Sequence, residues 1–207
     1  MGRKSDAGER ILDAAANLFA QRSYAAIGVA EISAAAGVPK GSFYYFYPSK
    51  QDLALAVVNR HWERQRAEWL RVLTAPEALS DRLHALFVST RQVQLQALNG
   101  TGAVAGCLFG NLALEVSAQD DPVRARLQQI FEEQIDIVEN AIRAGDESGE
   151  AGVTAPREAA KAIVAQIEGM VLFAKLFNDP GQLDQLWQNS MRLLGLPARG
   201  AVPAGRE

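Results

Sequence analysis

Residues 29–47 of the chain read VAEISAAAGVPKGSFYYFY, and this stretch decides the fold. Val29 and Ile32 recur at helical spacing and predict a short helix that ends at Gly37. A second short helix is predicted to begin at Lys40, directly after a proline, a residue favoured at helix starts. Two short helices joined by a tight, glycine-containing turn are a helix-turn-helix, the motif that this stretch predicts.

The second of these helices carries polar groups that a buried helix would lack. Lys40 and Ser42 precede a run of aromatic residues, three of which are tyrosines with a hydroxyl to place. Lysine, serine and tyrosine side chains on a short helix are typical of an element that enters the major groove of DNA and contacts phosphate. Phe43, Phe46 and Tyr47 are expected mainly to pack against the first helix and against the helix that begins at about residue 50.

Residues 24–50, YAAIGVAEISAAAGVPKGSFYYFYPSK, closely resemble the DNA-binding signature of the TetR family of transcriptional regulators. The resemblance is specific over about residues 8–60, and the family diverges beyond them. It implies a transcriptional regulator, leaning to a repressor, that binds double-stranded operator DNA. Carried over by position, the DNA-binding residues are Gly28, Lys40, Gly41, Ser42, Tyr44, Tyr45 and Lys50, the last of them at a phosphate.

Two residues at the start of the motif depart from the family pattern. The family usually has threonine followed by serine or threonine there, whereas this chain has Ile27 and Gly28. Gly28 can still serve as the N-cap of the helix at a small cost in stability. Because a side-chain hydroxyl is lost, backbone N–H groups are expected to contact phosphate in its place.

The rest of the chain also reads at helical period, and no segment alternates like a β-strand. Asp6 with Glu9, and Ser49 with Asp52, are predicted capping pairs at the starts of two helices. The fold class is therefore all-α, with about nine helices. Beyond the motif, helices are expected at about residues 50–73, 79–98, 107–117, 121–144, 154–177 and 183–194.

The predicted organisation is an N-terminal three-helix DNA-binding domain and a helical C-terminal domain. The first covers residues 1–50, the second covers residues 51–197 and serves effector binding and dimerisation, and a disordered tail covers 198–207. Residues 1–50 carry six basic and four acidic side chains, whereas the other residues bring the net charge of the chain to −3. A mildly basic head on an acidic body suits a protein that presents one end to phosphate.

The resemblance also implies a homodimer, built by helices near residues 156–177 and 182–194. Both segments are rich in the apolar and small residues that let one helix pack closely against another. Ala174 and Leu186 are predicted to lie in that interface. A two-fold dimer would double the contact of a small DNA-reading domain with a palindrome. The alternative is that the apolar residues of both segments serve only the core of one subunit.

The middle helices are expected to enclose a pocket for a small-molecule effector of unknown identity. Each candidate, taken singly, also fits an ordinary core or surface position. The candidate lining residues are Trp62, Trp69, Phe87, Arg91, Gln94, Phe109, Phe131, Glu168 and Phe173.

The single cysteine, Cys107, is a candidate sensor. It lies in residues 106–112, GCLFGNL, after a glycine-rich break and near the start of a helix, where the helix dipole favours a reactive thiolate. This segment resembles an electrophile-sensing subgroup of the TetR family, in which a lysine on a later helix partners the thiol. Lys175, which interrupts the apolar run 170–177, is the matching lysine. The alternatives are a reversible apolar or weakly polar effector, a cysteine kept for packing, and no small-molecule signal.

The composition disfavours several other classes of protein. One cysteine forms no intrachain disulfide or cysteine metal cluster, and His61 and His84 lack the spacing of a zinc site. No phosphate loop, nucleophile elbow or zinc-protease motif indicates an enzyme, so no catalytic residue, cofactor or metal is expected. The sequence has no signal peptide and no apolar run of about 20 residues, which predicts a cytoplasmic protein without a membrane segment. A transcriptional activator remains an alternative, and the acidic body disfavours a protein that coats DNA.

Overall fold

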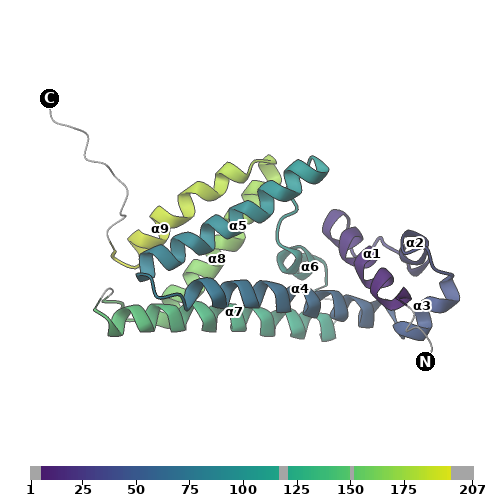
Figure 1. Ribbon diagram of the computed structural model, residues 1–207, viewed down its shortest axis with the longest axis horizontal. Helices are drawn as coiled ribbons and strands as arrows, with labels where there is room; N and C mark the ends of the chain where they lie inside the picture. The colour runs from purple at the N-terminus through teal and green to yellow at the C-terminus, as the bar shows by residue number, and fades with distance from the viewer. Residues whose placement is uncertain (1–5, 117–120, 150–151, 197–207) are drawn as a thin grey trace. The chain divides into compact units, whose positions relative to one another are not determined.

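The computed structural model describes residues 6–116, 121–149 and 152–196. Within these residues the chain forms nine α-helices and one short 3-10 helix and contains no β-strand (Figure 1), which confirms the predicted all-α fold. The helices are α1 (Ala7–Gln21), α2 (Val29–Ala35), α3 (Lys40–Phe46), α4 (Lys50–Leu73), α5 (Leu79–Thr101), α6 (Leu108–Val116), α7 (Asp121–Glu147), α8 (Pro156–Phe177), the 3-10 helix η1 (Pro180–Gln185) and α9 (Leu186–Leu193). The tail predicted at 198–207 and the end predicted for α6 at Ser117 lie outside the described residues.

The chain divides into two compact units. The first joins Met1–Arg66 with Ala105–Ile130, and the second joins Ala67–Val104 with Phe131–Glu207. The long helices α4 and α7 therefore contribute residues to both units. The first unit contains α6 as well as the three N-terminal helices, so the helix that follows Cys107 belongs to the same unit as the helix-turn-helix.

In the first unit, α1 packs against both α2 and α3. The apolar face of α1 is buried because Ile11, Ala15 and Phe19 recur at helical spacing. Ile32 from α2 and Phe43 from α3 are fully buried as well. Burying one side chain of this size stabilises a fold by about 1.5–3 kcal/mol, so these few residues fix the arrangement of the three helices.

In the second unit, α8 and α5 both pack against η1 and α9. The buried residues of α8, Ile163, Ile167, Val171 and Ala174, lie three or four positions apart and form one stripe. The chain leaves α8 at Asn178, whose φ of +51° is left-handed. Its side-chain amide then closes the end of α5, since Oδ1 accepts from the Val104 N–H at 2.8 Å and Nδ2 donates to the Gly102 carbonyl at 3.1 Å.

Local signals predicted some helix ends and missed others. The Ser49–Asp52 capping pair is confirmed, because the Asp52 N–H donates to Ser49 Oγ at 3.1 Å and that hydroxyl lies 2.7 Å from Asp52 Oδ2. The capping box predicted at Asp6 and Glu9 is wrong. The carboxylate of Asp6 instead pairs with Arg10 at 3.4 Å, and that of Glu9 pairs with Arg60 at 3.4 Å.

Several helix boundaries differ from the sequence-based expectation. The helix predicted to end at residue 144 continues through Gly145 to Glu147, and the helix predicted from residue 154 begins at Pro156. The helix predicted to end at residue 98 continues through the sequence Asn-Gly-Thr to Thr101, and only Gly102, with φ +78°, has the left-handed conformation that ends it. The last predicted helix is two elements, η1 and α9. Asp179 causes the tighter start, because its carboxylate accepts the Gly181 N–H at 2.8 Å directly after the chain turns.

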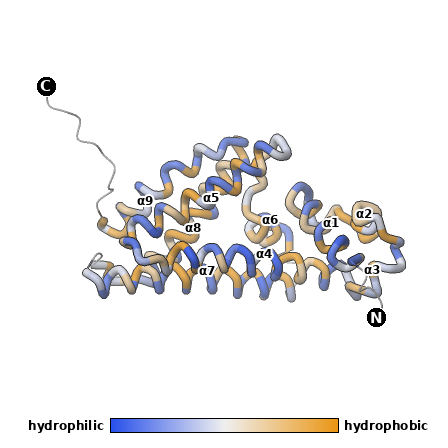
Figure 2. The backbone as a smooth tube through the Cα atoms, viewed as in Figure 1, coloured by the Kyte–Doolittle hydropathy of each residue, from blue (hydrophilic) through white to orange (hydrophobic). Residues whose placement is uncertain are grey.

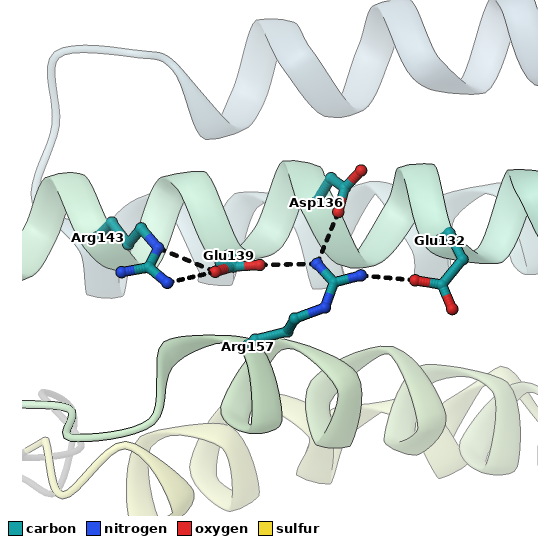
Figure 3. A network of polar contacts seen from close by, with 5 residues as sticks. All are labelled: Glu132, Asp136, Glu139, Arg143 and Arg157. Carbon is teal, nitrogen blue, oxygen red and sulfur yellow. Dashed lines mark hydrogen bonds and ion pairs between the residues drawn. The ribbon is translucent and has the colours of Figure 1, made fainter.

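Arg157 of α8 reaches three acidic residues on α7 (Figure 3). Its guanidinium donates to Glu132 at 2.6 Å, Asp136 at 2.7 Å and Glu139 at 2.8 Å. Arg143 donates to the other oxygen of Glu139, at 2.6 Å from Nη2. In Figure 2 hydrophobic and hydrophilic residues alternate along α7. The apolar residues that recur at helical spacing along α7 are buried, namely Val123, Leu127, Ile130, Val138 and Ile142.

Among the described residues, no helix is both long enough and apolar enough to cross a membrane.

Candidate nucleic-acid interface and sensor residues

The turn of the helix-turn-helix depends on one glycine. Gly37 has φ +63°, a left-handed conformation that strains any residue with a Cβ atom. The Gly37 N–H donates to the Ala34 carbonyl at 3.0 Å, and the Val38 N–H donates to the Ser33 carbonyl at 3.0 Å. These bonds close the end of α2 and direct the chain into α3, as the sequence predicts.

One side of α3 is used for packing inside the first unit. Phe43 is fully buried, and a methyl group on Gly8 of α1 would lie 2.9 Å from Cδ1 of Phe46. The hydroxyl of Tyr47 donates to the Gly8 carbonyl at 3.2 Å, and burial raises the pKa of this phenol. The packing predicted against α1 is therefore confirmed for Phe46 and Tyr47, and Phe43 is buried as expected. The packing predicted against α4 stays a prediction.

The other side of α3 is open to solvent. Tyr45 is 84% exposed and Tyr44 is 53% exposed, although both are large aromatic residues. Lys40 and Gly41 in the first turn of the helix are exposed, and Ser42 is half-buried. A cation and several hydroxyl groups thus lie on a short helix whose opposite side is packed inside the first unit.

Gly28 is the N-cap of α2, as expected from the sequence. It is exposed and has an extended backbone, and its carbonyl accepts the Ile32 N–H at 3.1 Å. Because glycine has no side chain to cover the first turn of α2, the N–H groups there stay open to an anion.

Lys50 lies differently from a surface lysine. Its ammonium donates to the carbonyls of Tyr24 and Ile27 at 3.0 Å each, and it lies 4.3 Å from the centroid of the Tyr24 ring. Burial lowers the pKa of Lys50, and the carboxylate of Glu115 opposes that effect. The expected phosphate contact therefore competes with two carbonyls of the chain itself for this cation.

Glu115 at the end of α6 is a residue that sequence reasoning missed. Its Oε2 accepts from the Ser23 hydroxyl at 2.7 Å and from the Ala25 N–H at 3.2 Å, both in the turn between α1 and α2. The contact joins residues about 90 positions apart, so no local pattern could have indicated it.

The predicted pocket residues fall into both units. Trp62, Cys107 and Phe109 belong to the first unit. Trp62 and Phe109 are buried against each other, with ring centroids 6.1 Å apart in an edge-to-face arrangement. This contact is also what an ordinary aromatic core provides.

The other pocket candidates belong to the second unit and differ in burial. Trp69, Phe87 and Gln94 are buried, and Phe131 and Glu168 are half-buried. The side chain of Arg91 is partly exposed and lies 2.8 Å from Asp184. Phe173 and Lys175 are exposed.

Cys107 immediately precedes α6 and is half-buried. Its Sγ accepts the Gly110 N–H at 3.5 Å, and its carbonyl accepts the Asn111 N–H at 2.9 Å. Hydrogen bonding from a helix N–H stabilises a thiolate relative to a thiol. Lys175, the lysine expected to partner this thiol, belongs to the other unit.

The second half of α8 exposes a row of large apolar residues on the side opposite its buried stripe. Those residues are Leu172, Phe173, Leu176 and Phe177. Ala174 and Leu186 were expected to face a partner subunit, and this expectation is wrong. Both are fully buried within the second unit, because they belong to the stripe through which α8, η1 and α9 pack on each other.

Together these features define a helix-turn-helix regulator of transcription. Residues 11–57 match the family described as "Bacterial regulatory proteins, tetR family", and residues 79–189 match "Tetracyclin repressor-like, C-terminal domain". The chain belongs to the TetR family and is a transcriptional regulator, not an enzyme.

Three comparisons place the chain within the family. The repressor DhaR of Mycobacterium sp. strain GP1 is 30% identical over 181 residues, which cover 86% of both chains. The repressor NemR of Escherichia coli K12 is 26% identical over 200 residues, which cover 93% of this chain and 96% of NemR. The crystal structure of the reduced form of E. coli NemR has a TM-score of 0.81 and 25% identity, over 93% of this chain and all of that one.

Proposed function

We propose that the protein is a repressor that binds a partly palindromic operator as a homodimer and leaves it in response to a small molecule or electrophile. The observation that carries this proposal is the exposed side of α3, with Tyr44, Tyr45 and Lys40 held on a packed helix-turn-helix. Members of the family bind DNA and act as dimers. Operator binding also implies a cytoplasmic location, where the DNA of a bacterium lies.

The DNA contacts are proposed to come from two helices. Lys40, Ser42, Tyr44 and Tyr45 would reach base edges and phosphates from α3, with Gly41 allowing close approach of the backbone. Gly28 would bring the N–H groups of the first turn of α2 to a phosphate. These are the exposed or half-buried positions on the polar side of the motif.

Purified protein should be footprinted on the DNA upstream of its own gene. We expect one protected region with two half-sites about one helical turn apart, because a two-fold dimer presents its two reading helices at that spacing. The affinity for that duplex should exceed the affinity for a scrambled duplex by at least about 1000-fold at physiological salt. Equal affinities would contradict specific operator binding. A reporter gene placed behind the protected region distinguishes repression from activation, since the protein should lower its expression as a repressor and raise it as an activator.

The dimer is proposed to form through α8 and α9. The exposed apolar row of α8 supports this arrangement, because Leu172, Phe173, Leu176 and Phe177 would otherwise keep large apolar surfaces in water. Leu193 of α9 is exposed as well. Apolar residues on two helices can form a four-helix bundle with the same residues of a second copy.

Two kinds of release signal are proposed for the helical C-terminal region. A reversible apolar or weakly polar effector would bind among the buried aromatic residues of the middle helices, such as Phe87 and Trp69. An electrophile would instead add to Cys107, whose Sγ accepts an N–H at the start of α6. The similarity to NemR, solved in a form described as reduced, supports the second signal.

The two signals are distinguished by titrating the operator complex with N-ethylmaleimide. The thiolate of Cys107 would add to the maleimide double bond, and the adjacent carbon would take up a proton from water. We expect wild type to release the duplex and Cys107→Ser to keep it. Release of both proteins, or of neither, would contradict thiol sensing and leave a reversible ligand as the signal to be sought.

A further inference from the structure

The turn between α1 and α2 is held by two side chains of opposite charge that come from distant helices. Lys50 of α4 and Glu115 of α6 both bond to the backbone of residues 23–27, and both belong to the first unit. Within the turn, the Ala26 N–H donates to Ser23 O at 3.1 Å. We call Lys50, Glu115 and Ser23 the turn clamp.

Lys50 fixes the carbonyl groups of the turn. Its two bonds, at 3.0 Å each, reach the carbonyl of Tyr24 and that of Ile27, the residue directly before the N-cap of α2. Tyr24 is itself held in place by α1, because its ring packs edge-to-face on Phe19 with ring centroids 5.2 Å apart. A shift of α4 at Lys50 would therefore be transmitted to the start of α2.

Glu115 fixes the other polar groups of the turn. A single carboxylate oxygen accepts both the Ser23 hydroxyl and the Ala25 N–H, and hydrogen bonds to an ionised group are the strong ones. The same carboxylate is close enough to Lys50 to favour its charged form. The clamp thus satisfies one N–H, one hydroxyl and two carbonyls of a turn that leads into the DNA-reading motif.

We infer that Glu115 is a positioning residue for DNA binding: through the turn clamp, a carboxylate on α6 sets the place of α2 and so the operator affinity. This inference rests on the proposed operator binding. A carboxylate near DNA repels phosphate, so Glu115 would weaken binding if its charge were all that mattered. If Glu115 acts through the turn clamp, its removal should lower the operator affinity. If it acts only by repelling phosphate, its removal should raise the affinity.

The test compares Glu115→Ala and Glu115→Gln on the footprinted duplex. Glu115→Ala should lower the affinity about tenfold, as expected for the loss of hydrogen bonds to a charged acceptor. The slope of log K against log salt should stay unchanged, because Glu115 contacts no phosphate. Glu115→Gln should recover most of the affinity, because its amide oxygen can still accept both bonds. Binding by Glu115→Ala that equals or exceeds wild type would overturn the inference, as would equal losses in both variants.

Glu9→Gln is the matched charge control. It removes one carboxylate from α1 in the same unit, and its partner Arg60 keeps Asp13 at 2.8 Å. We expect its affinity to equal or slightly exceed that of wild type.

Ser23→Ala removes a single bond of the clamp from an exposed position and should lower the operator affinity about threefold. In the double variant with Glu115→Ala the effect of Ser23→Ala should vanish, because the acceptor is already gone. A full additive loss would contradict the clamp.

Amide exchange in the absence of DNA separates this inference from the proposed function. The Ala25 N–H should exchange at least about tenfold faster in Glu115→Ala than in wild type, and Glu9→Gln should not change it. If wild type failed to prefer any duplex, operator binding would be contradicted, and an unchanged exchange rate in Glu115→Ala would independently overturn the clamp.

Discussion

Helices α3 and α8 each expose several large side chains to solvent, and the two surfaces differ in their polar groups. On α3 the exposed aromatics are Tyr44 and Tyr45, each with a hydroxyl, beside the ammonium of Lys40. On α8 the exposed large side chains include Leu176 and Phe177, which carry no polar group. A surface that combines aromatic rings with hydrogen-bond donors suits the phosphates and base edges of DNA. A row of apolar side chains without polar groups suits a protein partner that is apolar as well.

Both surfaces have a well-packed backing. Phe43 is fully buried behind the exposed tyrosines, and Ala174 is fully buried behind the exposed row of α8. The exposure is therefore a property of one side of each helix and does not reflect a loose fold. From this difference in chemistry we propose that the first surface binds DNA and that the second binds a second copy of the chain, and each proposal can be tested separately.

Leu176→Glu should have the largest effect. The residue is 70% exposed in the single chain, so a glutamate there would fold normally but would be buried without a partner in the proposed dimer. We expect a monomer in sedimentation and an operator affinity lowered by about 100-fold or more, since one half-site alone is bound weakly. Leu114→Glu, on a leucine of α6 that is 79% exposed, is the control and should sediment as a dimer. An unchanged dimer in Leu176→Glu would move the interface elsewhere.

Tyr45→Ala tests the polar surface alone. Loss of a specific side-chain contact should cost about 1–3 kcal/mol for the operator and much less for a scrambled duplex. The matched control is Tyr47→Phe, which removes a hydroxyl that points into the protein, toward Gly8. This control should keep its affinity for the operator. Fluorescence anisotropy with both duplexes measures the difference, and equal losses on both would contradict a role in specificity.

Lys40→Ala and Lys50→Met separate an exposed cation from one bound to carbonyls. Lys40→Ala should reduce the slope of log K against log salt by about 0.9 per half-site, because one phosphate contact is lost. Lys50→Met should weaken binding without changing that slope, since its ammonium donates to Tyr24 and Ile27. A reduced slope in Lys50→Met would restore the phosphate contact that the sequence resemblance implies.

Sequence patterns predicted features whose cause lies within a few residues. Gly37 ends α2 because its left-handed backbone requires a residue without Cβ, and the Ser49–Asp52 pair caps α4 through side chains three positions apart. The family signature likewise predicted which side of α3 faces solvent, since Phe43 is buried whereas Tyr44 and Tyr45 are exposed.

Features that depend on distant parts of the chain were not accessible in this way. Ala174 and Leu176 lie two positions apart in one apolar run, and periodicity alone does not tell which of them faces the core. The contact of Glu115 with Ser23 arises only when α6 reaches the turn after α1. A surface glutamate and a surface serine carry no signal that would pair them.

The smallest effect is expected where neither surface is involved, in the ion pairs of α7 with α8. Hydrogen bonds from Arg157 and Arg143 hold the pKa of Glu139 below its usual value. A carboxyl whose folded pKa is depressed stabilises the fold fully above its unfolded pKa, about 4.3, and loses that contribution as pH falls through the folded value. The Tm of Glu139→Gln should therefore lie below that of wild type by a constant amount between pH 7 and 5, and the gap should close below about pH 4. Because the Arg157 and Arg143 partners are about half exposed, at 47% and 55%, the gap should be at most about 3 °C and should shrink in high salt, although Glu139 itself is only 13% exposed. Glu63→Gln, on α4 and outside this network, is the control and should show no such gap. A gap for Glu139→Gln that persisted at pH 3 would assign its origin to packing and not to the charge.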